Sequence, residues 1–299
     1  SGDDIMVQGI GINRNNGMAG FDWVSYKGAD YAVDADMNVS LFVNQQNNIL
    51  RDRFDLVEGL SGWKNDDVLI GRNGAAVGAA LNAAMPGSTS PIESYSNALL
   101  EQNVDLVTGL RGLVSHLTPF QLTQATTGET KMAIMGTDAS DDIILGGGGN
   151  DRINGGEGED IIDGDKWLNV RIAVKDDAGT VIGTADGLTK QIFDIANPTV
   201  TLFGGATLQN ALFARDVKAA NLEIVREILD GDAANASIDS AVYWDVRANY
   251  DVVENLDGSF SVTHTNQVDG GVDPVTGRTL RNEGTDRLTN IERLEFADG

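Results

Sequence analysis

Two consecutive glycine-rich nonapeptides constrain the fold of this chain more than any other feature of its sequence. The first spans residues 146–154 and the second spans residues 155–163, and both fit the pattern G-G-x-G-x-D-x-U-x, in which U is a large apolar residue. Glycine adopts backbone conformations with positive φ, so six residues of each unit can form a tight turn whose carbonyls point inward. The other three residues can form a short strand whose central side chain, Ile153 or Ile162, points into the core. The pattern predicts a mainly β protein that contains parallel β-roll segments.

Acidic and apolar residues keep the same nine-residue period in the preceding segment, residues 137–145. The glycines are missing there, but Asp142 and Ile144 hold their places. Successive turns of a roll lie on alternate sides, so Asp142 and Asp160 are predicted to lie in neighbouring turns on one side. Two carboxylates and several carbonyl oxygens suit a hard cation, and Ca²⁺ accepts six to eight such ligands. The predicted calcium ligands of this block are Thr137, Ala139, Asp142, Gly146, Gly148, Asp151, Gly155, Gly156, Glu157, Gly158, Asp160 and Asp165.

Less regular copies of the pattern occur near the N-terminus and around residue 67. Asp4, Asn13 and Asp22 are spaced nine residues apart, and a glycine stands two residues before each of them. An asparagine can still offer an oxygen ligand, at lower charge than a carboxylate. A glycine-containing turn signal also surrounds Asp67. These four residues join the predicted calcium ligands, whereas Asp286, which stands alone, is expected to lie in a plain loop.

The distribution of these patterns predicts four regions. Residues 91–117 carry apolar side chains at helical spacing after a Ser-Pro start, which favours a helix within an insertion. Residues 207–229 fit a helix or a strand equally well. The turn signal at 255–258, between two alternating stretches, predicts a β-hairpin. The expected regions are a degenerate roll with inserted strands at 1–74, a helical insertion at 75–135, the main β-roll at 136–166 and a β-rich C-terminal region at 167–299.

The amino-acid composition disfavours several classes of binding partner. Asp and Glu number 45 against 21 Lys and Arg, which gives a net charge of −24 and disfavours binding to nucleic acid or anionic membranes. The absence of cysteine excludes disulfides and thiolate metal sites. No apolar run is long enough to span a membrane. Because the sequence begins and ends inside repeat-like motifs, we expect it to be a fragment whose partners are calcium ions and the rest of the parent polypeptide.

The nonapeptide block resembles the hemolysin-type calcium-binding repeats of RTX proteins. Residues 20–28 together with 51–59, and residues 160–171, are similar to the RTX-bearing region of large secreted bacterial proteins that also carry an animal-type haem peroxidase domain. Residues 289–299 are similar to a tail common in many RTX proteins. The resemblance implies type I secretion and calcium uptake outside the cell.

The resemblance does not extend to haem peroxidase chemistry in this chain. It needs histidines in a helical haem pocket, and the only two histidines here, His116 and His264, are expected to pack or to lie at the surface. The sequence therefore predicts a non-enzymatic calcium-binding structural module that folds on calcium binding. Two alternatives stay open. One is an adhesin module that binds a surface or a glycan, which would need an exposed aromatic cluster. The other is calcium-triggered self-cleavage at Asp273-Pro274.

Overall fold

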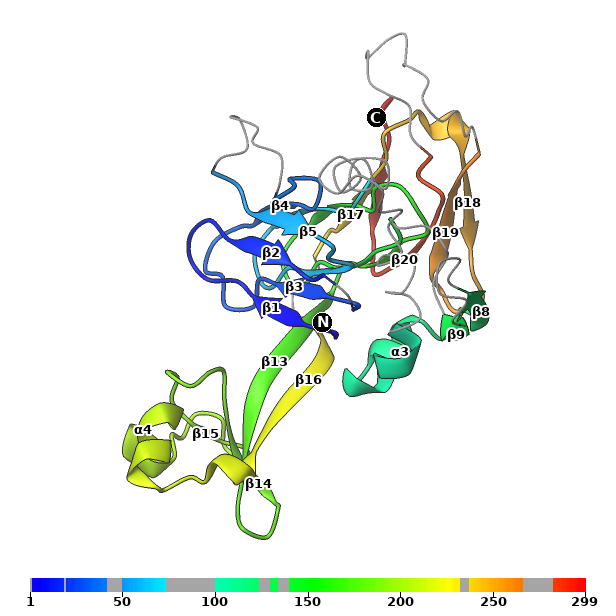
Figure 1. Cartoon of the computed structure of the whole chain (residues 1–299). Helices are drawn as coiled ribbons and strands as arrows, with labels where there is room; N and C mark the ends of the chain where they lie inside the picture. Colours follow the sequence, from blue (N-terminus) through cyan, green and yellow to red (C-terminus); the bar gives the residue numbers. More distant parts are fainter. Residues whose placement is uncertain are drawn as a thin grey trace. The chain divides into compact units, whose positions relative to one another are not determined.

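Short strands, many of them three residues long, make up most of the regular structure in the computed structural model of this chain (Figure 1). The structure describes residues 2–18, 20–41, 50–73, 100–123, 130–133, 140–231, 237–265 and 282–299. Contacts divide the chain into two compact units. The first comprises Ser1–Asp105, Leu110–Trp167 and Leu229–Gly299, and the second comprises Leu106–Gly109 and Leu168–Ile228.

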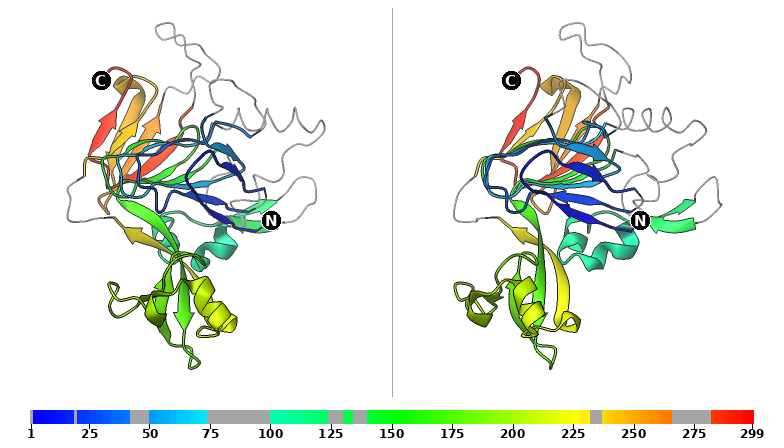
Figure 2. Two further views of the ribbon diagram at one scale, coloured as in Figure 1. Left: turned by 90° about the vertical axis from the view of Figure 1, so that its left-hand side faces the viewer. Right: turned by 60° about the vertical axis from the view of Figure 1, so that its left-hand side comes forward.

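One sheet of the first unit is assembled from segments that are far apart in the sequence. Its parallel strands, in spatial order, are β1 (Ile5–Val7), β3 (Trp23–Ser25), β6 (Gly59–Ser61), β10 (Ile143–Leu145), β12 (Ile161–Asp163) and β20 (Thr285–Thr289). Two antiparallel strands, β19 (Phe260–His264) and β18 (Tyr250–Glu254), complete it. The sheet is therefore mixed, with the blue N-terminal strands at one edge and the orange β18 at the other (Figure 2).

A second sheet of the first unit is wholly parallel. Its order is β4 (Asp34–Asp36), β7 (Val68–Ile70), β11 (Arg152–Asn154), β17 (Ser240–Val242) and β21 (Arg293–Glu295). Two separate pairs accompany the sheets. The parallel pair is β2 (Arg14–Asn16) with β5 (Arg53–Asp55), and the antiparallel pair is β8 (Phe120–Thr123) with β9 (Thr130–Ala133).

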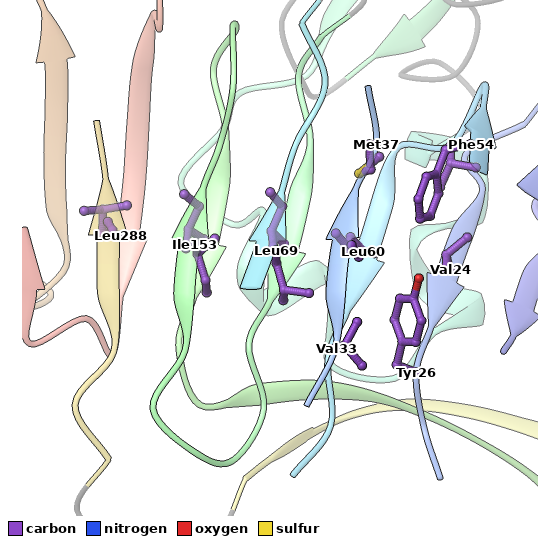
Figure 3. Close-up of a cluster of buried hydrophobic side chains, with 14 of the residues drawn as sticks. Val24, Tyr26, Val33, Met37, Phe54, Leu60, Leu69, Ile153 and Leu288 are labelled. Carbon is purple, nitrogen blue, oxygen red and sulfur yellow. The ribbon is translucent and has the colours of Figure 1, made fainter. Parts of the chain in front are cut away.

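The central residues of these strands share one hydrophobic core. In the first sheet they form a row in direct register, Val24, Leu60, Ile144, Ile162 and Leu288. Ala35, Leu69, Ile153 and Ala241 form the corresponding row in the second sheet. Figure 3 shows Leu60, Leu69 and Ile153 within this cluster. Because successive side chains of a strand alternate between faces, a three-residue strand contributes one side chain to the core. The predicted inward orientation of the three isoleucines is confirmed.

The second unit has its own sheet and core. Its sheet contains β15 (Phe193–Asp194), β14 (Val181–Ala185), β13 (Lys166–Lys175) and β16 (Leu222–Asp230). Residues 207–229, ambiguous from sequence, form the helix α4 (Leu208–Ala214) followed by β16. Thr207 caps α4 because its side chain accepts the Asn210 N–H. Ile192 and Leu208 are fully buried in this core.

The described elements confirm some of the local predictions and contradict one. The mainly β class and the hairpin around residues 255–258 are confirmed. The predicted helix at 91–117 falls partly outside the described residues. In the described part, residues 100–103 are helical and continue into a 3₁₀ turn, η2 (Val104–Leu106), and a short helix, α3 (Leu110–Leu113), follows after a break, so one continuous helix is wrong for this stretch. Gly109, with φ of 92°, lies between them and interrupts the helical backbone.

Candidate metal centre

A column of acidic residues crosses the first sheet at the start of its parallel strands, in the turns that precede them or, for Asp286, within β20. Its members are Asp4, Asp22, Glu58, Asp142, Asp160 and Asp286, each one residue before the paired residues of its strand. Backbone hydrogen bonds link neighbours in the column. The N–H of Asp4 donates to Asp22 Oδ1 at 2.7 Å, and the N–H of Asp142 donates to Asp160 Oδ1 at 2.8 Å. The stacking predicted for Asp4 with Asp22 and for Asp142 with Asp160 is present.

A second column accompanies the second sheet in the same way. Its members are Asp67, Asp151, Asp239 and Glu292. The N–H of Asp67 donates to Asp151 Oδ1 and the N–H of Asp151 donates to Asp239 Oδ1, both at 2.7 Å. Each linking carboxylate thus uses one oxygen to hold the backbone of the neighbouring turn, which leaves the second oxygen for another partner.

The second oxygen is buried and unsatisfied in four of these aspartates. In the described part of the chain, Oδ2 accepts no hydrogen bond in Asp22, Asp151, Asp160 and Asp239. A buried carboxylate oxygen without a partner is strongly unfavourable, so such atoms indicate a missing ligand or ion. Four equivalent orphan oxygens in two columns indicate a repeated site and not an isolated defect.

Glycine brings backbone carbonyls close to these oxygens. Gly146 stands five residues before Asp151, and a Cβ at Gly146 would lie 2.5 Å from Asp151 Oδ2 and would also overlap the Gly164 carbonyl oxygen. A Cβ at Gly155 would overlap Asp160 Oδ2 in the same manner. Only glycine fits at these positions, so each orphan carboxylate lies directly against the backbone of a glycine turn, which forms a cradle around it.

The donor set fits calcium better than other common metal ions. Calcium prefers six to eight carboxylate and carbonyl oxygens in flexible geometry. Within the residues that the structure describes, no three acidic or histidine side chains gather around one point. An ion would therefore take one carboxylate oxygen from a column and most of its remaining ligands from glycine-rich turns. The chemistry supplied by the ion is neutralisation of a buried charge.

The pKa values of the orphan aspartates reflect their burial. Loss of hydration raises the pKa of Asp22 to about 7, of Asp151 to about 8 and of Asp239 to about 6. Burial, together with the charges of Asp286 and Asp142, raises the pKa of Asp160 well above its ordinary value. Without a cation the folded chain thus favours protonated carboxyls at these positions, whereas a bound cation favours their ionised form.

Two turns of these columns are interrupted by long insertions, one between Gly71 and Asp142 and the other between Gly164 and Asp239. The glycine and the aspartate of an uninterrupted turn are five residues apart, as in Gly155 and Asp160. Gly71 stands against Asp142, and Gly164 against Asp239, in the same relation, with would-be Cβ to Oδ2 distances of 2.8 and 2.7 Å. The chain therefore leaves a turn after its glycine and returns before its aspartate without losing the contact between them.

The predicted ligands fall into several groups in the structure. Asp22, Asp151 and Asp160 have the orphan oxygens described above. Asp4 is exposed and joins the first column through its N–H. Asp67 Oδ2 already accepts the Trp63 N–H, at 3.2 Å. Among the turn glycines, Gly156 and Gly158 have positive φ values of 101° and 121°, and the turns 146–149 and 155–158 adjoin the columns. Thr137 and Ala139 lie outside the described residues.

Asn13 stands apart from both columns, whereas Asp165 lies near the second column without being one of its members. The Asn13 side-chain nitrogen donates to the carbonyls of Gly9 and Gly11, each at 3.2 Å. Its backbone N–H donates to Asp52, in the β2–β5 pair. An amide nitrogen therefore faces the carbonyls that a cation would face in another turn. Asp165 accepts the Ser237 hydroxyl at 3.0 Å, and its negative charge contributes to the raised pKa of Asp239 in the second column.

Sequence reasoning missed part of both columns. Asp286 is not in a plain loop: it is 1% exposed, and it accepts the Asp160 N–H at 3.3 Å. Glu58, Asp239 and Glu292 were not identified, because insertions remove the nine-residue spacing. Among the column members, an Asp-Asp doublet accompanies only Asp4, Asp67 and Asp142, which the spacing already predicts, so it could not have found the others. Its first members, Asp3, Asp66 and Asp141, each accept a backbone N–H from the adjacent turn.

Comparisons with known proteins identify the central segment. Residues 137–166 match a family model described as the RTX calcium-binding nonapeptide repeat in four copies. No curated protein and no solved structure matches the chain. In the described part of the chain, no helix has the length and apolar character needed to span a membrane. Residues 137–166 are an RTX calcium-binding repeat region, and it lies in the middle of both acidic columns.

Replacement of Asp160 by asparagine should weaken calcium binding. Asparagine keeps an oxygen for the Asp142 N–H but removes the charge that faces the glycine cradle. We expect an affinity loss of about a hundredfold or more at this site, equivalent to roughly 2.8 kcal/mol, which leaves the site empty at calcium concentrations that just saturate the wild type. Calorimetric titration with calcium measures it. Asp251→Asn, at an exposed strand position of the same unit, is the matched control. Equal affinities for the two variants would contradict the assignment of Asp160.

The calcium-free protein should lose stability as the pH rises. The folded-state pKa values of Asp22, Asp151 and Asp239 lie above the unfolded value of about 3.9, so their contribution is fully present below pH 4 and is lost as the pH rises through about 6 to 8. Melting temperatures in EDTA should fall from pH 5 to pH 8.5. Saturating calcium should abolish this fall, because a bound ion stabilises the ionised carboxylates. A melting temperature in EDTA that is constant or rises with pH would argue against buried, uncompensated carboxyls.

Proposed function

We propose that this chain is a calcium-binding structural module of a secreted bacterial protein, in which the turns of the first unit coil as a parallel β-roll and close when calcium binds outside the cell. The observation that carries the proposal is the set of four buried Oδ2 atoms, each against a glycine turn. The RTX repeat at 137–166 supports calcium as the ion and secretion as the context.

The proposed mechanism is neutralisation of acidic columns whose ionised carboxylates destabilise the closed roll. Asp22, Asp160 and Asp286 lie in one column with raised pKa values, so their ionised forms oppose folding. Extracellular calcium modules bind with Kd values of roughly 10⁻⁴ to 10⁻³ M, so such sites fill outside the cell and stay unfilled at cytosolic calcium levels. Each site at one hundred times its Kd adds about 2.7 kcal/mol to folding.

Calcium would also offset the cost of long-range closure. β6 pairs with β10 and β7 pairs with β11 at a separation of 84 residues, and β12 pairs with β20 at a separation of 126 residues. Bringing such distant segments together costs chain entropy before any contact forms. An ion held between turns that belong to different segments gains its binding energy only when those segments meet.

We propose no catalytic role for this region. His264 is buried, lies 3.2 Å from Asp245 Oδ2 and stacks on Tyr250 with ring centroids 4.6 Å apart. His116 contacts the Leu113 carbonyl at the end of α3. Both environments support packing or surface roles. The Asp273-Pro274 bond lies outside the described residues, so the hypothesis of self-cleavage at this bond rests on the sequence alone.

A calcium titration followed by far-ultraviolet circular dichroism tests the proposed function. We expect the β signal of the chelated protein to be reduced, and calcium to restore it with a midpoint in the submillimolar to millimolar range. Magnesium at the same concentration serves as the control, because its small octahedral shell does not suit a carbonyl-rich cradle. A spectrum and a melting temperature indifferent to EDTA would contradict calcium-dependent folding.

A second candidate function, binding of a neutral oligosaccharide, is favoured by one cleft in the first unit. The cleft has a volume of about 530 Å³, and two half-buried tryptophans, Trp63 and Trp167, line it. The rest of the lining consists of Lys64, three glycines and polar groups that can bind hydroxyls, namely Asn150, Asp165, Asp230 and Ser237. Indole faces with adjacent carboxylate and amide groups suit a sugar ring, which has apolar faces and a polar edge. Trp23, by contrast, is 2% exposed and packs in the interior.

Calorimetric titration with cellohexaose and chitohexaose in saturating calcium tests this second candidate. We expect at least one of the two sugars to bind, and Trp167→Ala to weaken that binding at least tenfold through loss of the stacking face. Trp244→Ala, which changes a partly exposed tryptophan outside the cleft, should leave the affinity unchanged. The candidate is rejected if neither sugar binds or if Trp167→Ala binds as the wild type does.

A further inference from the structure

One turn of the first column already contains a cation that belongs to the chain. The Arg72 side chain is 4% exposed and lies beside Asp142 and Glu58. Its Nε donates to Asp142 Oδ1 at 2.7 Å, and its backbone N–H donates to Asp142 Oδ2 at 2.6 Å. The remaining guanidinium nitrogens reach Glu58 Oε1 at 3.4 Å and the Asp141 carbonyl at 3.0 Å.

Arg72 replaces a turn glycine. Gly71 leads its turn as Gly146 and Gly155 lead theirs, so Arg72 holds the place of Gly147 and Gly156. Those glycines carry no side chain that could enter the space between turns. Arginine at this place delivers a planar group that can bind a carboxylate and a carbonyl at once.

Asp142 consequently differs from the four aspartates with orphan oxygens. Both of its carboxylate oxygens accept hydrogen bonds from Arg72, whereas Oδ2 of Asp160, the next acid in the column, accepts none in the described part of the chain. A divalent ion placed beside the guanidinium would meet a like charge at close range in a poorly hydrated interior. The Asp142 turn therefore does not fit calcium.

We infer that Arg72 is a permanent counter-ion that takes the place of calcium between Glu58 and Asp142. The inference rests on the proposed function, because it concerns a turn in the same column. Arg72 follows β7 of the second sheet, whereas Glu58 and Asp142 precede β6 and β10 of the first sheet. The guanidinium thus joins both sheets where the chain departs into the insertion at 74–139, and it does so without calcium.

The number of calcium ions bound at saturation distinguishes the two kinds of turn. It is measured by calorimetric titration, and by atomic emission on protein dialysed to equilibrium against saturating calcium, for the wild type, Asp142→Asn and Asp160→Asn. We expect Asp142→Asn to bind as many ions as the wild type and Asp160→Asn to bind one fewer. A loss of one ion in both variants overturns the inference, as does an unchanged number in both. A wild type that binds no calcium refutes the proposed function instead.

A second variant tests the counter-ion if Asp142→Asn does not fold. Arg72→Lys keeps the charge but cannot bind two groups in fixed geometry, so it should lower the melting temperature. The decrease should have the same size in EDTA and in saturating calcium, because no ion shares this position. Lys166→Arg, at a partly exposed position of the same unit, should leave the melting temperature nearly unchanged in both conditions. An Arg72→Lys decrease that calcium removes would overturn the inference.

Discussion

The first unit depends on buried aspartates whose two carboxylate oxygens have different roles. One oxygen accepts the backbone N–H of the neighbouring turn, as Asp160 Oδ1 accepts the N–H of Asp142. The other faces a glycine turn and has no hydrogen-bond partner among the residues that the structure describes. The first contact sets the register between neighbouring turns, and the second creates a charge that must be neutralised. The same side chain therefore aligns the fold and makes it conditional on a cation.

Three means of neutralisation follow from the sequence at each turn. Where glycine occupies the first two turn positions, as before Asp151 and Asp160, the cradle is open to calcium. Where arginine follows the first glycine, as before Asp142, the chain supplies its own guanidinium. At Asn13 an amide nitrogen takes the carbonyls, and the neighbouring carboxylate of Asp52 accepts hydrogen bonds from Asn13 and from the Tyr26 hydroxyl. Variation of one or two turn residues thus changes the cation requirement while the strand register is kept.

The sequence predicts the local part of this architecture well. A nine-residue period is enough to orient Ile144, Ile153 and Ile162 inward and to stack Asp142 next to Asp160, because neighbouring repeats leave no freedom in spacing. The nine-residue period does not predict contacts across the insertions. Asp239 and Asp286 join the columns after insertions that break the period. Arg72 was also missed, since its role depends on Glu58 and Asp142, which only the folded chain brings together.

Anomalous diffraction from crystals grown in calcium tests the central claim most directly. The account predicts ion peaks within about 2.3 to 2.6 Å of the Oδ2 atoms of Asp22, Asp151, Asp160 and Asp239. It predicts no peak between Glu58 and Asp142, where Arg72 lies. Ion peaks confined to exposed acidic loops, with none at the buried aspartates, would contradict it.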